Sequence, residues 1–145
     1  MTDPADRAGI AELLADYARA VDTKDWELYK SVFSADAVVD YTSSGGPRGT
    51  REQVAEWVSS ALEPFTMTQH LVTNLHVEVE GDNATCRSDY YNPMGMPDGA
   101  GRLALFFVGG LYLDRLRRSE GGWLITERVE EMLWITPTTR GRDHI

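Results

Sequence analysis

The sequence predicts an α+β fold in which a curved antiparallel sheet wraps around N-terminal helices to form a cone with an internal pocket. Apolar residues recur with helical spacing in the first half of the chain, whereas the second half consists of long extended stretches. Helices followed by an antiparallel meander are typical of α+β domains, in which the helices cover one face of the sheet. Two glycines inside an apolar strand, Gly109 and Gly110, indicate the bulge or bend that curvature requires.

The composition is that of one folded domain, residues 1–145, with 42% hydrophobic and 26% charged residues. The net charge of -9 and the lack of a basic stripe predict no nucleic-acid partner, because phosphate binding requires clustered cations. An anionic surface also disfavours membrane adsorption, so we expect no membrane partner. One cysteine cannot form an internal disulfide, and neither a signal peptide nor a membrane-spanning apolar run is visible. We therefore expect a cytoplasmic protein.

The first expected helix has clear boundaries. Asp3 is positioned to cap it, and Pro4 suits the first helical position. Apolar residues then follow the spacing of one helical face, which Asp22 closes. These residues are Ile10, Leu13, Leu14, Tyr17, Ala18 and Val21.

A short second helix is expected through residues 26–33, followed by a strand at 37–41 and a glycine-rich loop at 42–49. Thr50 and Gln53 form a capping-box pattern before a third, amphipathic helix.

Three extended stretches make up the expected sheet. They cover residues 67–79, 84–92 and 102–135, the last interrupted by a turn at 119–122. Gly-Asp-Asn at 81–83 is a good hairpin turn between the first two.

Polar residues on faces that should be apolar are the candidates for a site. Tyr17 and Asp22 lie on, or at the end of, the apolar face of the first helix, although Asp22 could equally end that helix or cap the next. His70 and His76 share one face of a regular strand, but a bulge would change the phase part-way, so their directions stay open. Asp40 and Tyr41 are neighbours at the end of a strand, so one of them is expected to point inward.

Other candidates come from the later strands. A polar-aromatic cluster at 89–92 includes Tyr90 and Asn92, and a loop at 92–101 carries Met94 and Met96. With Pro97, these methionines suit either a flexible lid over an apolar ligand or an ordinary hairpin loop. The three histidines lack metal-ligand spacing, and no nucleotide-binding or nucleophile motif occurs. We expect no metal and no cofactor.

Four segments carry a resemblance to a known family. They are Tyr17 to Asp22 with Lys24-Asp25-Trp26, then Val39-Asp40-Tyr41, then Thr68-Gln69-His70 continuing to Leu75, and finally Gly109-Gly110-x-Tyr112 with Arg117-Arg118 and Gly122-Trp123. In this order they resemble the SnoaL-like branch of the nuclear transport factor 2-like superfamily. The individual motifs are similar to those of scytalone dehydratase, bile-acid 7α-dehydratase and hexachlorocyclohexane dehydrochlorinase. The resemblance implies a helix-lined cone.

The resemblance also implies roles for particular residues. His70 matches a histidine that acts as the base, and Asp22 matches the aspartate that orients it. Tyr17 matches an oxyanion-stabilising tyrosine, and Tyr41 matches one that contacts substrate or water. Asp40 falls where ketosteroid isomerases keep an aspartate base.

The sequence departs from scytalone dehydratase at three positions. Met94 stands where that enzyme has a second histidine, and Gly110 and Tyr112 replace its serine and asparagine. Tyr112 also falls near the acid of the ketosteroid isomerase oxyanion hole. An Asp–His dyad without a second histidine is closer to the dehydrochlorinase and bile-acid dehydratase pattern.

The expected function is a cofactor-independent lyase, by dehydration or dehydrohalogenation, or an isomerase. A histidine base oriented by a carboxylate suits proton abstraction at neutral pH. The expected substrate is small, hydrophobic and cyclic, steroid-like or polyketide-like. The residues expected to contact it are Tyr41, Asp40, Trp26, Trp57, Phe65, Tyr90, Asn92, Met94 and Tyr112.

Two other functions stay open. One is a non-catalytic binding or interaction module, and the other is the small subunit of an aromatic-ring dioxygenase. Residues 105–108 are apolar on both faces of their strand, which predicts a homodimer or homotrimer packed through the sheet.

Overall fold

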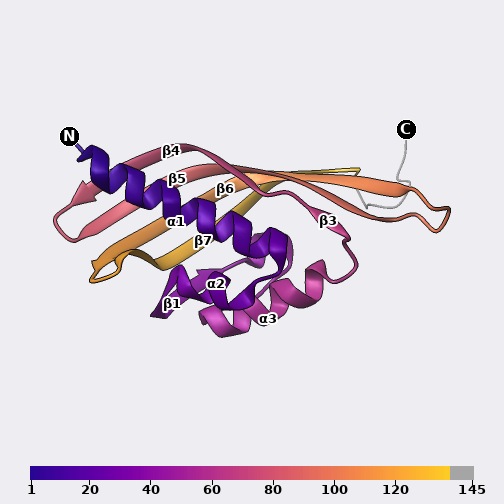
Figure 1. Cartoon of the computed structure of the whole chain (residues 1–145), viewed down its shortest axis with the longest axis horizontal. Coiled ribbons are helices and arrows are strands. Elements are labelled where there is room, and N and C mark those ends of the chain that lie inside the picture. Colours follow the sequence, from indigo (N-terminus) through magenta and orange to yellow (C-terminus); the bar gives the residue numbers. More distant parts are fainter. Residues whose placement is uncertain (138–145) are drawn as a thin grey trace.

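A computed structural model of the chain describes residues 1–137 (Figure 1). The helices are α1 (Pro4–Thr23), α2 (Trp26–Ser31), η1 (Thr42–Ser44, 3-10) and α3 (Arg51–Leu62). The strands are β1 (Phe33–Asp40), β2 (Arg48–Gly49), β3 (Met67–Thr68), β4 (Leu71–Glu80), β5 (Asn83–Pro97), β6 (Leu103–Ser119) and β7 (Gly122–Thr136).

The strands form one curved, unclosed sheet in the order β2-β1-β7-β6-β5-β3, and β4 also pairs with β5. All pairings are antiparallel except that of β1 with β7, which is parallel. Helix α1 lies across the sheet, with α2 and α3 beside it (Figure 1). The predicted α+β cone is confirmed. Within residues 1–137, no helix is both long enough and apolar enough to cross a membrane.

The helix boundaries follow from local chemistry. The Asp3 carboxylate accepts a hydrogen bond from the backbone N–H of Ala5, and the Thr50–Gln53 capping box forms at the start of α3, as predicted. The prediction for the second helix was too long, because α2 ends at Ser31 and Phe33 already begins β1. Strand β1 is correspondingly longer than predicted.

Three bulges decide which side chains face the helices. In β4 the register against β5 shifts between Thr73 and His76, so buried positions change from even to odd numbers. In β7 the register against β6 shifts once at Thr126 and again at Leu133. Residues beyond each bulge therefore face the opposite side from the one that simple alternation predicts.

The predicted irregularity at Gly109 and Gly110 is confirmed, since the β6–β7 register shifts between them. The two glycines face opposite sides of the sheet. A Cβ on Gly109 would lie 2.3 Å from the Trp134 ring, and one on Gly110 would lie 2.7 Å from the Tyr90 hydroxyl. The missing side chains let an aromatic ring from a neighbouring strand lie over β6 on each face.

The core contains a fully buried ion pair. Arg128 of β7 donates to both carboxylate oxygens of Asp114 of β6, at 2.7 and 2.8 Å, and both side chains are 0% exposed. The guanidinium also lies against the Tyr112 and Tyr17 rings, 4.0 and 4.2 Å from their centroids. This contact connects α1 to the two central strands.

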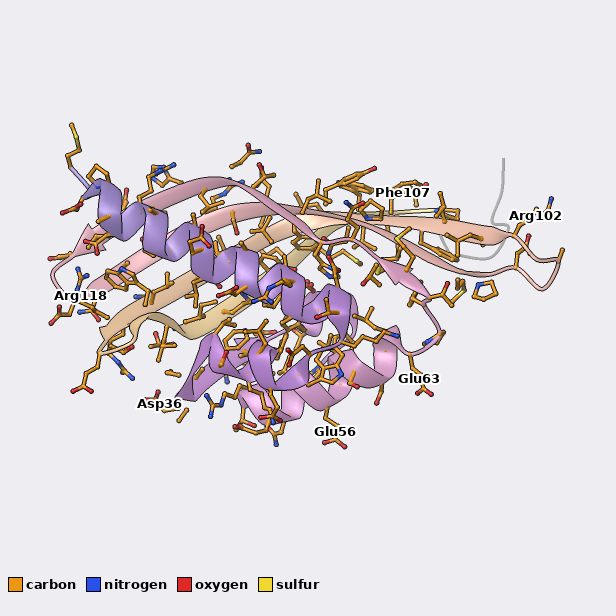
Figure 2. All side chains as sticks on the ribbon, viewed as in Figure 1. Asp36, Glu56, Glu63, Arg102, Phe107 and Arg118 are labelled. Carbon is orange, nitrogen blue, oxygen red and sulfur yellow. The ribbon has the colours of Figure 1, made fainter. Side chains whose placement is uncertain are left out.

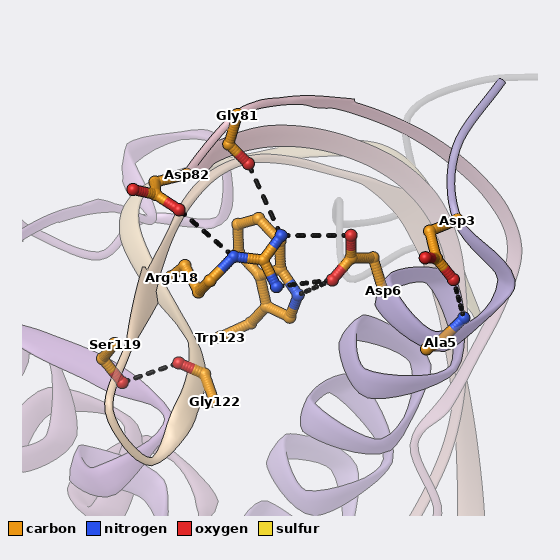
Figure 3. A network of polar contacts seen from close by, with 9 residues as sticks. All are labelled: Asp3, Ala5, Asp6, Gly81, Asp82, Arg118, Ser119, Gly122 and Trp123. Carbon is orange, nitrogen blue, oxygen red and sulfur yellow. Dashed lines mark hydrogen bonds and ion pairs between the residues drawn. The ribbon is translucent and has the colours of Figure 1, made fainter.

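A second polar network connects the start of α1 to the β6–β7 hairpin (Figure 3). Arg118 donates to both carboxylate oxygens of Asp6, at 2.6 and 3.1 Å, and to Asp82 at 3.3 Å. The indole N–H of Trp123 also donates to Asp6 at 3.2 Å. The Arg118 guanidinium holds the pKa of the Asp6 carboxyl below its usual range.

The prediction of a lid at 92–101 was wrong. Strand β5 continues to Pro97 and pairs with Leu103, which leaves only residues 98–102 as a turn. Arg102 lies at the tip of this hairpin, away from the helices (Figure 2). Met94 and Met96 are therefore strand residues with regular partners on β6.

Apolar side chains are exposed on the outer face of the sheet. Tyr91 packs against Phe107 and Trp134, with ring centroids 6.1 and 5.7 Å apart, and Tyr91 and Trp134 are each 41% exposed. Leu71, which pairs with Tyr91, and Leu133, which precedes Trp134, are also exposed. A homo-oligomer packed through this face stays a prediction.

The wild-type protein is expected to be a dimer or trimer at micromolar concentration in light scattering. Glutamates in place of Tyr91 and Trp134 would place charges in the packed face and shift the protein to monomer, whereas Thr85→Glu, on the same strand, would not. A monomeric wild-type protein would contradict this prediction.

Removing one partner of the buried ion pair should be costly. Asp114→Ala leaves a buried guanidinium without its counter-ion and should lower the free energy of unfolding by about 3–5 kcal/mol in urea denaturation. Replacing both partners (Asp114→Leu with Arg128→Met) should recover most of this loss. The exposed pair Arg115–Glu127 supplies the control, because Glu127→Gln should cost less than about 1 kcal/mol. A similar small loss for Asp114→Ala would contradict the prediction.

Candidate active site

A cavity of about 230 Å³ lies between α1, α3 and the inner face of the sheet. Its apolar wall comes mainly from α3 and the ends of β6 and β7, while its polar groups come from α1 and the central strands. The lining residues are Tyr17, Val21, Tyr41, Ser44, Trp57, Val58, Ala61, Leu62, Phe65, His70, Tyr90, Asn92, Met94, Val108, Tyr112, Glu130, Met132 and Ile135.

Asp22, in the last turn of α1, contacts the segment that joins β3 to β4. Its carboxylate accepts three hydrogen bonds, from the His70 ring Nδ1 at 2.7 Å, the His70 backbone N–H at 2.8 Å and the Thr68 hydroxyl at 3.0 Å. A carboxylate is unfavourable at the C-terminal end of a helix, where the partial charge is negative. The three donors offset this cost and fix the carboxylate against His70.

The hydrogen bond to Asp22 assigns the histidine tautomer. An ionised carboxylate only accepts, so the contact requires the proton on Nδ1, and in the neutral imidazole Nε2 then keeps its lone pair. The His70 side chain is 8% exposed and lines the cavity. A basic nitrogen is therefore available to a ligand in a largely desolvated position.

Three tyrosine hydroxyls form a chain at the base of the cavity. Tyr17 hydrogen-bonds to Tyr41, and its hydroxyl lies 3.3 Å from that of Tyr112. Burial raises the pKa of Tyr17, although the Arg128 guanidinium opposes the shift, and burial raises the pKa values of Tyr41 and Tyr112 further. All three hydroxyls thus keep their protons at neutral pH. Two O–H groups satisfy the chain, which leaves one for a ligand.

Glu130 is a second titratable group in the cavity, and it was not predicted. Its carboxyl accepts a hydrogen bond from the Ser44 hydroxyl, and the Ser43 hydroxyl, which donates to the Glu130 backbone carbonyl at 2.8 Å, lies 3.4 Å from the carboxyl. Burial raises the pKa of this carboxyl, and the serine hydrogen bonds and the Arg128 charge lower it only in part. Simple alternation from the buried Ile125 would point Glu130 outward. The bulge at Thr126 reverses this direction, and Glu130 was missed because the residues give no sign of the bulge.

Most of the predicted site residues lie around this one cavity. Those that line it are Tyr17, Tyr41, Trp57, Phe65, His70, Tyr90, Asn92, Met94 and Tyr112, and Asp22 stands directly behind His70.

Three candidate residues lie elsewhere. Trp26 packs edge-on against Tyr29, at 5.8 Å between ring centroids, and does not line the cavity. The Asp40 carboxylate accepts from the backbone N–H and hydroxyl of Thr42, which lowers the pKa of Asp40, so it shapes a turn. His76 is 73% exposed because the β4 bulge separates its direction from that of His70.

Within residues 1–137, no group of three or more His, Cys, Asp or Glu side chains is arranged to hold a metal ion.

Comparison with known proteins agrees with this architecture. The sequence profile of the SnoaL-like domain matches residues 3–129. The uncharacterized protein Rv2910c of Mycobacterium tuberculosis (strain ATCC 25618 / H37Rv) is 36% identical over 126 residues, which cover 87% of this chain and 84% of that protein.

Two solved structures are similar along most of their length. A proposed aromatic ring hydroxylase from Novosphingobium aromaticivorans is 30% identical with a TM-score of 0.81, and the match covers 92% of this chain and 93% of that one. A type 2 hexachlorocyclohexane dehydrochlorinase (LinA) is 24% identical with a TM-score of 0.77, and the match covers 94% and 90%. At that identity the second likeness concerns the fold alone.

Proposed function

This chain belongs to the SnoaL-like domain family, and on that premise we propose that it is a cofactor-independent lyase or isomerase acting by proton abstraction. Its substrate is a small, mainly apolar cyclic compound. The observation that carries the proposal is the 2.7 Å contact between Nδ1 of His70 and the Asp22 carboxylate at the wall of the cavity. A simple binding module has no need of an oriented, desolvated base.

The proposed reaction begins with transfer of a substrate C–H proton to Nε2 of His70. Asp22 holds the ring in the tautomer that exposes Nε2 and stabilises the imidazolium that forms. The free O–H of the tyrosine chain donates to an oxygen atom on which negative charge develops. The buried Arg128 guanidinium, 4.2 Å from the Tyr17 ring, adds a fixed positive charge beneath that chain.

The volume of the cavity favours a compact substrate. A volume of about 230 Å³ lies below the range of about 300–1,000 Å³ that is typical for drug-sized ligands. Aromatic and aliphatic side chains such as Trp57, Phe65 and Val58 form much of the wall. A substrate with one or two rings fits these dimensions better than a full steroid.

A second candidate is the small subunit of a ring-hydroxylating enzyme, which would require a large partner subunit. The similarity to the 30% identical Novosphingobium protein, a proposed aromatic ring hydroxylase, favours it. The two candidates can be distinguished by their need for a partner. The lyase or isomerase should convert its substrate without any other protein, whereas the small subunit should be inactive without its large subunit.

Elimination activity should depend on the dyad. His70→Ala should lower kcat by about 10²–10⁴-fold because it removes the general base, and Asp22→Asn should cause a loss of similar kind. The double variant should be little slower than either single variant, since the two residues act as one unit. Tyr17→Phe should cost less.

The assay is chloride release from hexachlorocyclohexane and the appearance of enone absorbance from a panel of one- and two-ring β-hydroxyketones. His76→Ala is the matched control, because His76 is exposed and should leave kcat unchanged. Wild-type rates in His70→Ala, or additive losses in the double variant, would contradict the proposal.

A further inference from the structure

Glu130 and His70 belong to different parts of the cavity wall. His70 joins β3 to β4, both of which pair with β5, whereas Glu130 lies on β7. Strands β5 and β6 lie between them in the sheet. Both side chains line the cavity from these separate positions, so a ligand in the cavity can lie between them.

The hydrogen bonds of Glu130 distinguish its two oxygen atoms. The Ser44 hydroxyl donates to Oε1, whereas the Ser43 hydroxyl donates to the backbone carbonyl oxygen of Glu130 at 2.8 Å and lies 3.4 Å from Oε1. Within residues 1–137, Oε2 makes no hydrogen bond, and the residue lines the cavity. In the neutral carboxyl the Ser44 hydroxyl therefore donates to the carbonyl oxygen, and the acidic proton sits on Oε2, where a ligand can accept it.

Two other buried polar atoms at this wall have no partner among residues 1–137. They are the Tyr90 hydroxyl and Oδ1 of Asn92, in residues that are 3% and 5% exposed. The Tyr90 ring lies over Gly110, and its hydroxyl is close enough to the Glu130 carboxyl for each group to affect the pKa of the other. Unpartnered buried polar atoms destabilise a fold, so each one calls for an explanation. A ligand oxygen that carries a hydrogen would satisfy both Asn92 and Glu130.

We propose that Glu130 is a catalytic acid that donates its Oε2 proton to a hydroxyl group of the substrate, with Tyr90 and Asn92 completing the hydroxyl site. This inference rests on the proposed role of His70 as the base. His70 takes the C–H proton, the electron pair of that C–H bond forms the C=C bond, and the C–O bond breaks with its electron pair on oxygen. The departing hydroxyl takes the Glu130 proton and leaves as water. Transfer of the His70 proton to Glu130 through solvent restores both groups.

The hydroxyl site also specifies the class of substrate. A hydroxyl both accepts from Glu130 and donates to Asn92, whereas a chlorine substituent cannot donate at all. The site therefore favours a cyclic alcohol that loses water over a halogenated hydrocarbon that loses chloride.

The test uses two-ring probes whose binding needs no turnover. 1-Tetralone carries an oxygen that only accepts hydrogen bonds, and tetralin is the same bicycle without it. Calorimetry should show roughly tenfold tighter binding of tetralone than of tetralin when Glu130 is neutral. Glu130→Met keeps the side-chain length but has no donor, so it should still bind tetralin and lose the preference. Glu131→Gln is the matched control, because Glu131 is exposed and adjacent.

The pH dependence separates Glu130 from the tyrosines. The groups that face its carboxyl are Arg128, Ser43, Ser44 and Tyr90, and His70 lines the same cavity. Measured in a His70→Ala background, the tetralone preference should fall as the pH rises through the raised pKa of Glu130, because the carboxylate cannot donate.

Three results would overturn the proposal: equal affinities for the two probes in the wild type, a preference retained in Glu130→Met, or a preference unchanged at high pH. Failure of the His70 proposal is a separate outcome, since that proposal is judged from kcat alone.

Discussion

The buried ion pair between Arg128 and Asp114 is the interaction on which the other parts of the site depend. It joins β6 to β7, and its guanidinium supports the Tyr17 ring of α1 and the Tyr112 ring of β6. Burying an ion pair is an expensive way to stabilise a core, and apolar replacements are often as stable. Its guanidinium lies against the rings of two tyrosines that line the cavity, and its positive charge opposes the rise in the pKa of Tyr17 that burial causes. The pair therefore has an electrostatic role, since a positive charge there favours negative charge on the tyrosine hydroxyls.

The cavity exists because the sheet bends away from the helices while polar groups occupy its inner face. Gly110 lets the Tyr90 ring cross β6, and the bulge at Thr126 turns Arg128 and Glu130 inward. Asp22, at the end of α1, holds His70 at the other wall. The result is a compact space that contains a histidine held by a carboxylate, a buried carboxyl of raised pKa and a chain of tyrosine hydroxyls. The proposed proton transfer would use these groups.

Much of this arrangement could be predicted from the sequence, because short-range signals carry it. The caps at Asp3 and Thr50, the apolar face of α1 and the order of helices and strands all follow from local spacing. The positions of Arg128 and Glu130 could not be predicted, because a single extra residue at Thr126 reverses the alternation of a long strand. The continuation of β5 to Pro97 was missed because the prolines and the glycine at 93–97 are typical of a turn. In the structure these residues nevertheless pair regularly with β6.

The most direct measurement of the central claim is the protonation of the His70 ring by ¹⁵N NMR in the absence of any substrate. At a pH where the ring is neutral, Nδ1 should carry the proton and Nε2 should not, and Asp22→Asn should weaken or reverse this preference. His76 provides the internal reference, because it is exposed on the other side of the β4 bulge. A His70 ring protonated on Nε2, or unaffected by Asp22→Asn, would contradict the account.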